Sequence, residues 1–123
     1  MSEAEHLRAG RRAEEIALHH LECRGLRLLT RNYRCRAGEL DLVMDDGESL
    51  VVVEVRYRRD SSHGTPAETV GAQKQAKLIR SASHFLQTHP RLARRSLRFD
   101  VVAVCGATAA PEIDWIADAF RPA

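Results

Sequence analysis

Cysteine and long apolar runs are scarce in this sequence. Its three cysteines (Cys23, Cys35 and Cys105) are an odd number at wide spacing, and no C-x-x-C pair occurs. That pattern argues against a disulfide framework and against a structural zinc site, so we expect reduced, mostly buried thiols. No apolar stretch reaches the roughly 18 residues of a transmembrane helix, and the N-terminus is charged where a signal peptide is apolar. We therefore expect a cytoplasmic protein without membrane contact.

A strong excess of charge is also lacking. The formal net charge is +2 and the pI is about 8.6, which is unlike proteins that coat nucleic acid nonspecifically. Arginines nevertheless gather in four stretches, at residues 8–12, 31–36, 56–59 and 91–98, so local basic surface is expected. A length of 123 residues fits one domain over residues 1–123, and neither repeats nor low-complexity segments are visible.

The stretch from Gly38 to Arg58 predicts a β-hairpin. Two runs of alternating or β-branched apolar residues flank Asp46-Gly47, a strong hairpin signal. A two-residue turn there places Asp41 opposite Val52. Because side chains alternate between faces, one face is expected to carry Glu39, Asp41, Val43, Val52, Glu54 and Arg56. The other face is expected to carry Leu40, Leu42, Val51, Val53 and Val55.

The first of these faces combines three carboxylates with one guanidinium among apolar neighbours. Carboxylates this close raise one another's pKa unless a cation intervenes, and a divalent metal resolves the conflict. The alternative is a solvated face on which Arg56 pairs with Glu54 or Asp41, each pair contributing some tenths of a kcal/mol. The hairpin alone leaves both interpretations open.

The spacing of apolar residues and the positions of glycine and proline predict the remaining helices and strands. We expect a helix over residues 2–24 with Ser2 as its cap, a start delayed by Gly10, and a buried stripe of Ala13, Ile16, Ala17 and Leu21. Strands are expected at 26–35 and 97–105, and a short edge strand at 112–116. A second helix is expected between Thr65-Pro66 and His89-Pro90, with a break near Gly71. The strand, helix and strand imply a parallel crossover.

Two residues in the last part of the chain need a structural explanation. Asp100 interrupts a near-continuous apolar strand, and buried carboxylates need partners. We favour a structural partner, either Lys74 or an arginine near the site, over a position at the wet end of the strand. Trp115 is the only tryptophan and is expected to be a core or edge anchor without chemistry.

Several short motifs occur in a fixed order between Gly10 and Phe120. They are Gly10-x-x-Ala13-Glu14-x-x-Ala17, Asn32-Tyr33-Arg34, Gly38-Glu39-Leu40-Asp41-Leu42, Val53-Glu54-Val55-Arg56-x-Arg58, His63-Gly64, Lys74-Gln75 and Arg98-Phe99-Asp100-Val101. In this order the chain resembles the YraN family, bacterial proteins predicted to be endonucleases. That family is related to Holliday-junction resolvases and to the PD-(D/E)xK nuclease superfamily.

The resemblance implies an α/β fold with a restriction-endonuclease-like αβββαβ core, a mixed sheet flanked by helices, in a single nuclease-like domain over residues 1–123. It also implies a hydrolase that cleaves phosphodiester bonds in DNA with Mg²⁺ or Mn²⁺. Analogy with the resolvases adds branched DNA as a substrate and a homodimer as the assembly.

Carried over residue by residue, the resemblance makes Asp41 and Glu54 metal ligands, with the backbone carbonyl of Val55 completing the shell. Glu14, otherwise a solvated helix residue, adds a carboxylate or orients a water. Oxygen ligands of this kind suit Mg²⁺. The catalytic set is then Glu14, Asp41, Glu54 and Arg56.

Four basic residues are candidates for DNA binding: Arg34, Arg58, Lys74 and Lys77. Lysines near a helix start favour anions. Arg31, Asn32 and Arg34 either face a phosphate backbone or line an exposed strand face, which is the more frequent outcome. Arg58 and Lys74 are also candidates for reaching into the metal site itself.

Arg56 departs from the superfamily pattern, which has lysine at this position. A guanidinium stays charged and cannot act as a base, but it can clamp a phosphate and stabilise the transition state. Two functions therefore remain: a metal-dependent endonuclease, which we favour, and a catalytically weak or inactive nucleic-acid-binding or adaptor protein. A salt-bridge patch on a small interaction domain ranks third.

Overall fold

The computed structural model describes residues 2–59, 70–106 and 110–122. Its elements, in chain order, are α1 (Glu3–Glu22), β1 (Arg27–Cys35), β2 (Gly38–Asp45), β3 (Ser49–Arg58), α2 (Ala72–Thr88), the short 3-10 helix η1 (Pro90–Leu92), β4 (Ser96–Cys105) and β5 (Glu112–Phe120). This order contains the expected αβββαβ sequence of elements, followed by one more strand.

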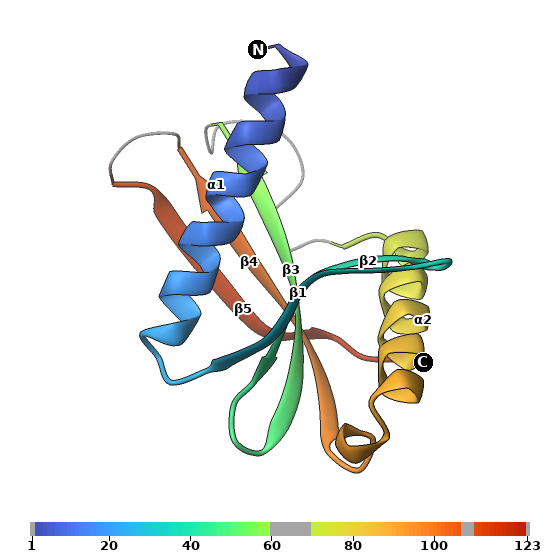
Figure 1. Cartoon of the computed structure of the whole chain (residues 1–123). Helices are drawn as coiled ribbons and strands as arrows, with labels where there is room; N and C mark the ends of the chain where they lie inside the picture. The colour runs from blue at the N-terminus through green and yellow to red at the C-terminus, as the bar shows by residue number, and fades with distance from the viewer. Residues whose placement is uncertain (1, 60–69, 107–109, 123) are drawn as a thin grey trace.

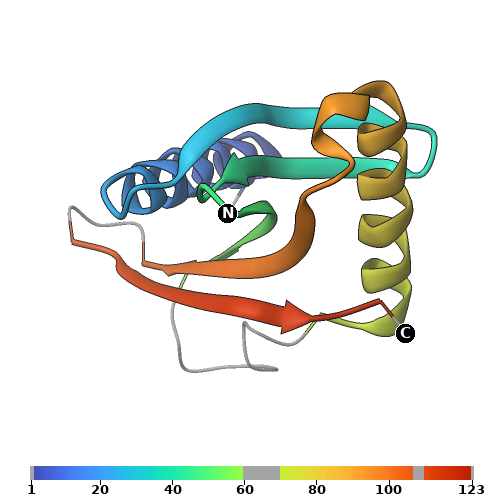
Figure 2. The same ribbon diagram turned by 90° about the horizontal axis from the view of Figure 1, so that it is seen from below.

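The strands form one mixed five-stranded sheet in the order β1-β2-β3-β4-β5. The pair β3 and β4 is parallel, and the other three pairs are antiparallel. Figure 1 shows α1 and α2 on opposite sides of this twisted sheet. Seen from below in Figure 2, the hairpin of β1 and β2 extends along the sheet as far as α2. The fold class predicted from the sequence is confirmed.

Helix α1 begins at Glu3 because Ser2 caps it, accepting a hydrogen bond from the Glu5 amide at 3.1 Å. The helix continues through Gly10, so the predicted delay of its start is wrong. A glycine in an exposed helix interior costs only about 1 kcal/mol, which the packing of the next turns offsets. The buried positions are Ala13, Ala17, Leu18 and Leu21, while Ile16 from the predicted stripe is only partly buried.

Each helix covers one face of the sheet with its own apolar cluster. The α1 cluster includes Leu42, Met44, Val51, Val53, Val102 and Val104 from the sheet. The α2 cluster includes Leu40, Val43, Val52, Phe99 and Val101 together with Leu78, Ala82 and Phe85 of the helix. The central strands β3 and β4 are therefore covered on both faces.

The hairpin between β2 and β3 has a different register from the predicted one. Asp45 pairs with Leu50 and Val43 pairs with Val52, so the connection is longer than two residues. The Asp46 carboxylate accepts hydrogen bonds from the backbone amides of Glu48 and Ser49, at 2.9 and 2.6 Å. This side-chain capping of the turn stabilises the longer loop. The register differs by two residues, and the expected faces of β3 are unchanged.

Alternation along β2 is interrupted beside Asp41. Leu40 packs in the α2 cluster, whereas Leu42 packs in the α1 cluster. The prediction that these two leucines share a face is therefore wrong. Opposite them in β1, Asn32 has a left-handed φ of 53°, and a residue in this conformation bends a strand and re-aims its neighbours.

Helix α2 begins after Gly71, which is its N-cap. The predicted Thr65 cap and Pro66 lie outside the described residues, as do His63-Gly64. The helix ends at Thr88, directly before His89-Pro90, as expected from the restriction that proline places on its predecessor. Gly38 lies close to α2, since a Cβ at Gly38 would be 3.4 Å from the Ser81 hydroxyl.

Asp100 is fully buried in β4 and receives donors from three residues. Arg98 donates to both of its carboxylate oxygens, at 2.9 and 3.0 Å. The Trp115 indole donates at 2.9 Å and the Asp118 amide donates at 2.8 Å, both from β5. Asp100 therefore has a structural partner, as expected, and it joins β5 to β4. Trp115 is an edge anchor, and its indole N–H makes the bond.

Two further sequence expectations concern the cysteines and the membrane. Cys23 is exposed and the other two thiols are half-buried, so the expectation of mostly buried cysteines is wrong, although all three are free. Among the helices in the described part of the chain, none is long and apolar enough to cross a membrane.

Candidate functional site

The strands β2 and β3 separate beside Asp41. Their ladder runs from Asp45–Leu50 to Leu42–Val53 and then stops, while β2 stays paired with β1 and β3 stays paired with β4. Across the opening, the Val55 amide donates a hydrogen bond to Asp41 Oδ2 at 2.9 Å. A side-chain carboxylate thus replaces the backbone acceptor that a continued ladder would supply. We call this opening the fork, formed by Asp41, Glu54 and Val55.

Glu54 is the buried carboxylate of the fork. Its side chain is 9% exposed, and its Oε2 lies 3.4 Å from the Lys74 ammonium on α2. Burial, the charge of Asp41 and a hydrogen bond between the two carboxyl groups raise the pKa of Glu54 to about 7, against the opposing effects of Lys74 and Arg56. The charged form of Glu54 is thus poorly solvated, and Lys74 and Arg56 compensate it only in part.

Glu14 reaches the fork from the other side of the sheet. With Asp41, Val55 and Tyr57 it lines a cavity of about 220 Å³ beneath the N-terminal half of α1. Partial burial and the charges of Asp41 and Glu39 raise the pKa of Glu14. Asp41 is thus the common neighbour of Glu14 and Glu54. It reaches Glu54 through the opening between the strands, rather than by sharing a strand face as the alternation predicted.

Asn32 is a part of this region that sequence reasoning missed. With its amide nitrogen oriented to donate, Asn32 lies 3.1 Å from a carboxylate oxygen of Glu14 and 3.1 Å from one of Glu39. From the sequence, Asn32 was expected to face a phosphate backbone or to line an exposed strand face, and no contact with these carboxylates was expected. Asparagine tolerates the left-handed conformation better than most residues. An asparagine within a predicted strand was therefore the one sequence feature that could have indicated this break in alternation.

Two buried polar atoms beside the fork are left without hydrogen-bond partners. Arg56 follows Glu54 by two residues on β3 and shares its strand face. Within the described residues, the buried Nε of Arg56 and the buried hydroxyl of Tyr57 have no hydrogen-bond partner. Buried donors without partners are costly, so a ligand that accepts hydrogen bonds would stabilise both groups. No pattern in the sequence pointed to Tyr57.

The candidate DNA-binding residues do not all lie at the fork. Lys74 does, through its contact with Glu54. Arg34 is 80% exposed in its side chain and lies 3.8 Å from Glu39. It lines a cavity of about 520 Å³ that also includes Glu14 and Asn32. Lys77 is exposed on α2, whereas Arg58 is the last residue of β3, beyond the fork and opposite Cys105 of β4.

The donor set of the fork suits a hard divalent cation. Among the described residues, no three His, Cys, Asp or Glu side chains form a preformed metal cluster. Mg²⁺ is usually held by one or two carboxylates, with waters and substrate phosphates completing its shell. Asp41 and Glu54 supply two carboxylates. The carbonyl of Val55 faces the same side of β3 as its amide, so it points into the fork as well.

Fold and fork together define a mixed α/β protein with an acidic cluster where two central strands separate. The chain belongs to the Uncharacterised protein family UPF0102, whose model matches residues 13–104. That range includes the fork, Glu14 and Lys74, and it ends before β5.

Curated relatives cover nearly the whole chain. A UPF0102 protein of Stutzerimonas stutzeri (strain A1501) is 53% identical over 113 residues, which are 92% of this chain and 94% of the relative. A UPF0102 protein of Nitrosococcus oceani is 47% identical over 121 residues, 98% of each chain. One of Pseudomonas aeruginosa (strain LESB58) is 50% identical over 113 residues, 90% of each chain.

Proposed function

We propose that this protein is a metal-dependent endonuclease that hydrolyses DNA phosphodiester bonds at the fork. One observation carries the proposal: Asp41 and Glu54 meet where the strands separate, and burial together with the charge of Asp41 raises the pKa of Glu54 to about 7. Two adjacent carboxylates with too little compensating charge favour a divalent cation. The resemblance to the YraN family and the PD-(D/E)xK nucleases supports the same function.

Each residue of the fork has a role in this proposal. Asp41 and Glu54 hold Mg²⁺ or Mn²⁺ with the Val55 carbonyl, and Glu14 orients a water from the α1 side. The bound ion lowers the pKa of a coordinated water and neutralises charge that develops on the phosphate. Arg56, with its Nε unpartnered, donates hydrogen bonds to the scissile phosphate and stabilises the transition state.

Basic residues around the fork bind the DNA backbone in this proposal. Lys74 and Lys77 present ammonium groups near the start of α2, and Arg34 presents a guanidinium at the larger cavity. Arg58 is assigned to DNA outside the fork. Such contacts position a duplex without reading its sequence. By analogy with the resolvases, we propose branched DNA as a substrate and a homodimer as the assembly, which sedimentation velocity of the free protein tests.

A second candidate function is DNA binding without turnover. Arg56 favours it, because a guanidinium cannot exchange a proton with the attacking water as the superfamily lysine can. In that case the protein would be a nucleic-acid-binding or adaptor protein with a nuclease fold. Binding and cleavage have to be measured on the same DNA molecules to separate the two functions.

The test uses four end-labelled DNAs, linear duplex, single-stranded, flapped and four-way, with Mn²⁺ or Mg²⁺ or EDTA. The nuclease proposal expects cleavage of at least one DNA by wild type, and none with EDTA. Asp41→Asn is the informative variant, because an amide oxygen can still accept the Val55 hydrogen bond while the negative charge is lost. Glu48→Gln, an exposed carboxylate in the β2–β3 turn, is the matched control.

Binding without metal-dependent cleavage on all four DNAs would favour the adaptor over the nuclease. If the protein neither bound nor cleaved any of the four DNAs, both functions would be overturned. Calorimetry with Mn²⁺ gives a further check on the fork. Unchanged metal affinity in Asp41→Asn and Glu54→Gln would remove the metal site, and the nuclease proposal with it.

A further inference from the structure

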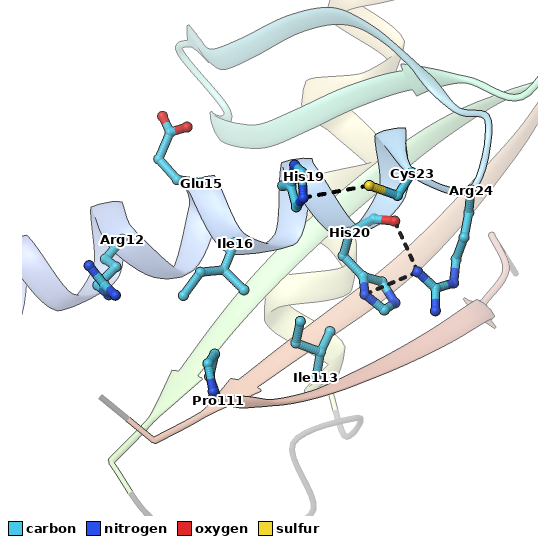
Figure 3. Close-up of a pocket in the computed structure, with 9 residues that line it drawn as sticks. All are labelled: Arg12, Glu15, Ile16, His19, His20, Cys23, Arg24, Pro111 and Ile113. Carbon is cyan, nitrogen blue, oxygen red and sulfur yellow. Dashed lines mark hydrogen bonds between the residues drawn. The ribbon is translucent and has the colours of Figure 1, made fainter. Parts of the chain in front are cut away.

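A second cavity, of about 620 Å³, lies between the C-terminal half of α1 and the start of β5. The fork residues Asp41, Glu54 and Val55 do not line it. His19 and Cys23 lie one helical turn apart on its wall, and both are exposed. Cys23 Sγ is 3.6 Å from His19 Nε2. Figure 3 shows the sulfur directed toward the imidazole ring.

The separation of these two atoms matches a tetrahedral metal site. Zinc binds thiolate sulfur at about 2.3 Å and imidazole nitrogen at about 2.0–2.1 Å, and a tetrahedral angle then places the two atoms about 3.6 Å apart. The separation between Cys23 Sγ and His19 Nε2 is 3.6 Å. An ion can therefore bind both residues without a change of backbone or helix register. The cavity gives the ion access to them.

The other side chains of this cavity that could act as metal ligands already contact other residues. Glu15, one turn before His19, forms an ion pair with Arg31 at 2.7 Å. The Nδ1 of His20 is 3.3 Å from the Arg24 guanidinium, and its ring contacts the edge of Trp115 with centroids 6.3 Å apart. The remaining wall is formed by Ile16, Pro111 and Ile113 and by the side chains of Arg12 and Arg24. Water molecules would then complete the coordination of an ion bound by His19 and Cys23.

The position of the pair on α1 favours a cation over a reactive thiolate. Cys23 is the C-cap of the helix, and the C-terminal end of a helix dipole is negative. A lone thiolate is disfavoured there, which argues against a nucleophilic Cys–His dyad. A divalent ion with one thiolate and one neutral imidazole carries a net positive charge, which the same dipole stabilises.

We infer that His19 and Cys23 form a surface site for a thiophilic or borderline divalent ion such as Zn²⁺. On binding, the thiol of Cys23 loses its proton to the buffer, a sulfur–metal bond forms, and the ion exchanges two of its waters for sulfur and nitrogen. Sulfur and imidazole ligands select such ions against Mg²⁺. This site is chemically distinct from the fork, and the inference does not depend on the proposed nuclease function.

The test is a titration of the metal-free, reduced full-length chain with Co²⁺, followed by competition with Zn²⁺. We expect a thiolate-to-cobalt charge-transfer band that saturates at one Co²⁺ per chain, separate from any Co²⁺ bound at the fork. The ion that gives this band should be displaced by Zn²⁺ but not by Mg²⁺. Cys23→Ser should abolish the band, and His19→Gln should weaken binding at least about tenfold, the smaller loss seen even for outer-shell partners. Both residues are exposed, so neither substitution threatens the core.

Two matched controls lie close to the site or share its chemistry. His20→Gln changes the neighbouring histidine of the same cavity, and Cys105→Ser removes a thiol on β4; both should retain the band and the affinity. Absence of the charge-transfer band in wild type would overturn the inference. So would unchanged Co²⁺ affinity in His19→Gln, or loss of the band in Cys105→Ser.

Discussion

The Val55 amide donates its hydrogen bond to the Asp41 carboxylate, at 2.9 Å, where β2 and β3 separate. This bond means that Asp41 has two functions that substitutions can separate. Its oxygen satisfies a donor that the interrupted ladder leaves open, and its charge acts on both Glu14 and Glu54. The first function concerns stability, and the second concerns the proposed metal site.

The two functions of Asp41 predict different stabilities for two substitutions. Asp41→Asn keeps an oxygen acceptor for the Val55 amide, and removing the charge relieves repulsion of Glu54. We expect its stability to lie within about 1 kcal/mol of wild type, whereas Asp41→Ala leaves the amide unpaired and loses about 1–3 kcal/mol. Urea unfolding measures both. Equal losses in the two variants would contradict the structural function of the carboxylate oxygen.

Glu54 predicts an unusual pH dependence in metal-free buffer. Its pKa is raised from 4.5 to about 7 in the folded state. The folded protein therefore binds more protons than the unfolded chain between these values, and stability falls as the pH rises through that window.

Glu54→Gln should remove this destabilisation. In the presence of EDTA we expect the variant to be more stable than wild type by about 2–3 kcal/mol near pH 8, with little difference near pH 4, where the carboxyl is protonated in both states. Urea unfolding across that pH range is the measurement. If wild type instead became more stable than Glu54→Gln as the pH rises, the raised pKa of Glu54 would be contradicted.

Asp100 predicts a large effect on stability that is independent of the fork. Asp100→Ala leaves the Trp115 indole, the Asp118 amide and the buried part of Arg98 without their acceptor. Removing one partner of such a buried charged network costs about 3–5 kcal/mol. Thermal or urea unfolding measures this loss. Asp114→Ala, an exposed position on β5, is the control and should stay within about 0.5 kcal/mol.

Replacing Arg56 by lysine tests whether the fork needs a guanidinium or only a positively charged side chain. If Arg56 acts through its positive charge, Arg56→Lys should cleave DNA at a rate equal to or above that of wild type, since lysine can also exchange a proton. Initial rates on the preferred DNA, with circular dichroism as a check of folding, give the comparison. Complete loss of cleavage in a folded Arg56→Lys would show that the guanidinium itself is needed.

Much of this architecture could be predicted from the sequence because it depends on local patterns. The patterns of apolar residues predicted the hairpin between Gly38 and Arg58 and the strand at 97–105, and Ser2 and His89-Pro90 predicted helix ends. The carboxylates Asp41 and Glu54 were predicted to be neighbours, and the structure brings them together.

The details that the sequence did not predict depend on side chains that bond to the backbone. Asp46 lengthens the hairpin loop by accepting from Ser49 and Glu48, a choice that the Asp46-Gly47 signal does not reveal. Asn32 adopts a left-handed conformation. Beside it, Leu40 packs on the face of the sheet that α2 covers. Strict alternation cannot anticipate such a local break in a ladder.

A metal-dependent nuclease at the fork requires the charge of Asp41 for DNA cleavage. The decisive measurement is the single-turnover cleavage rate with Mn²⁺ for wild type, Asp41→Asn and the control Glu48→Gln, on the DNA that wild type cleaves best. We expect Glu48→Gln to match wild type and Asp41→Asn to lose at least about 100-fold, because a metal ligand is lost while the fold is kept. Equal rates for Asp41→Asn and wild type, or cleavage that persists in EDTA, would contradict a metal-dependent nuclease at the fork.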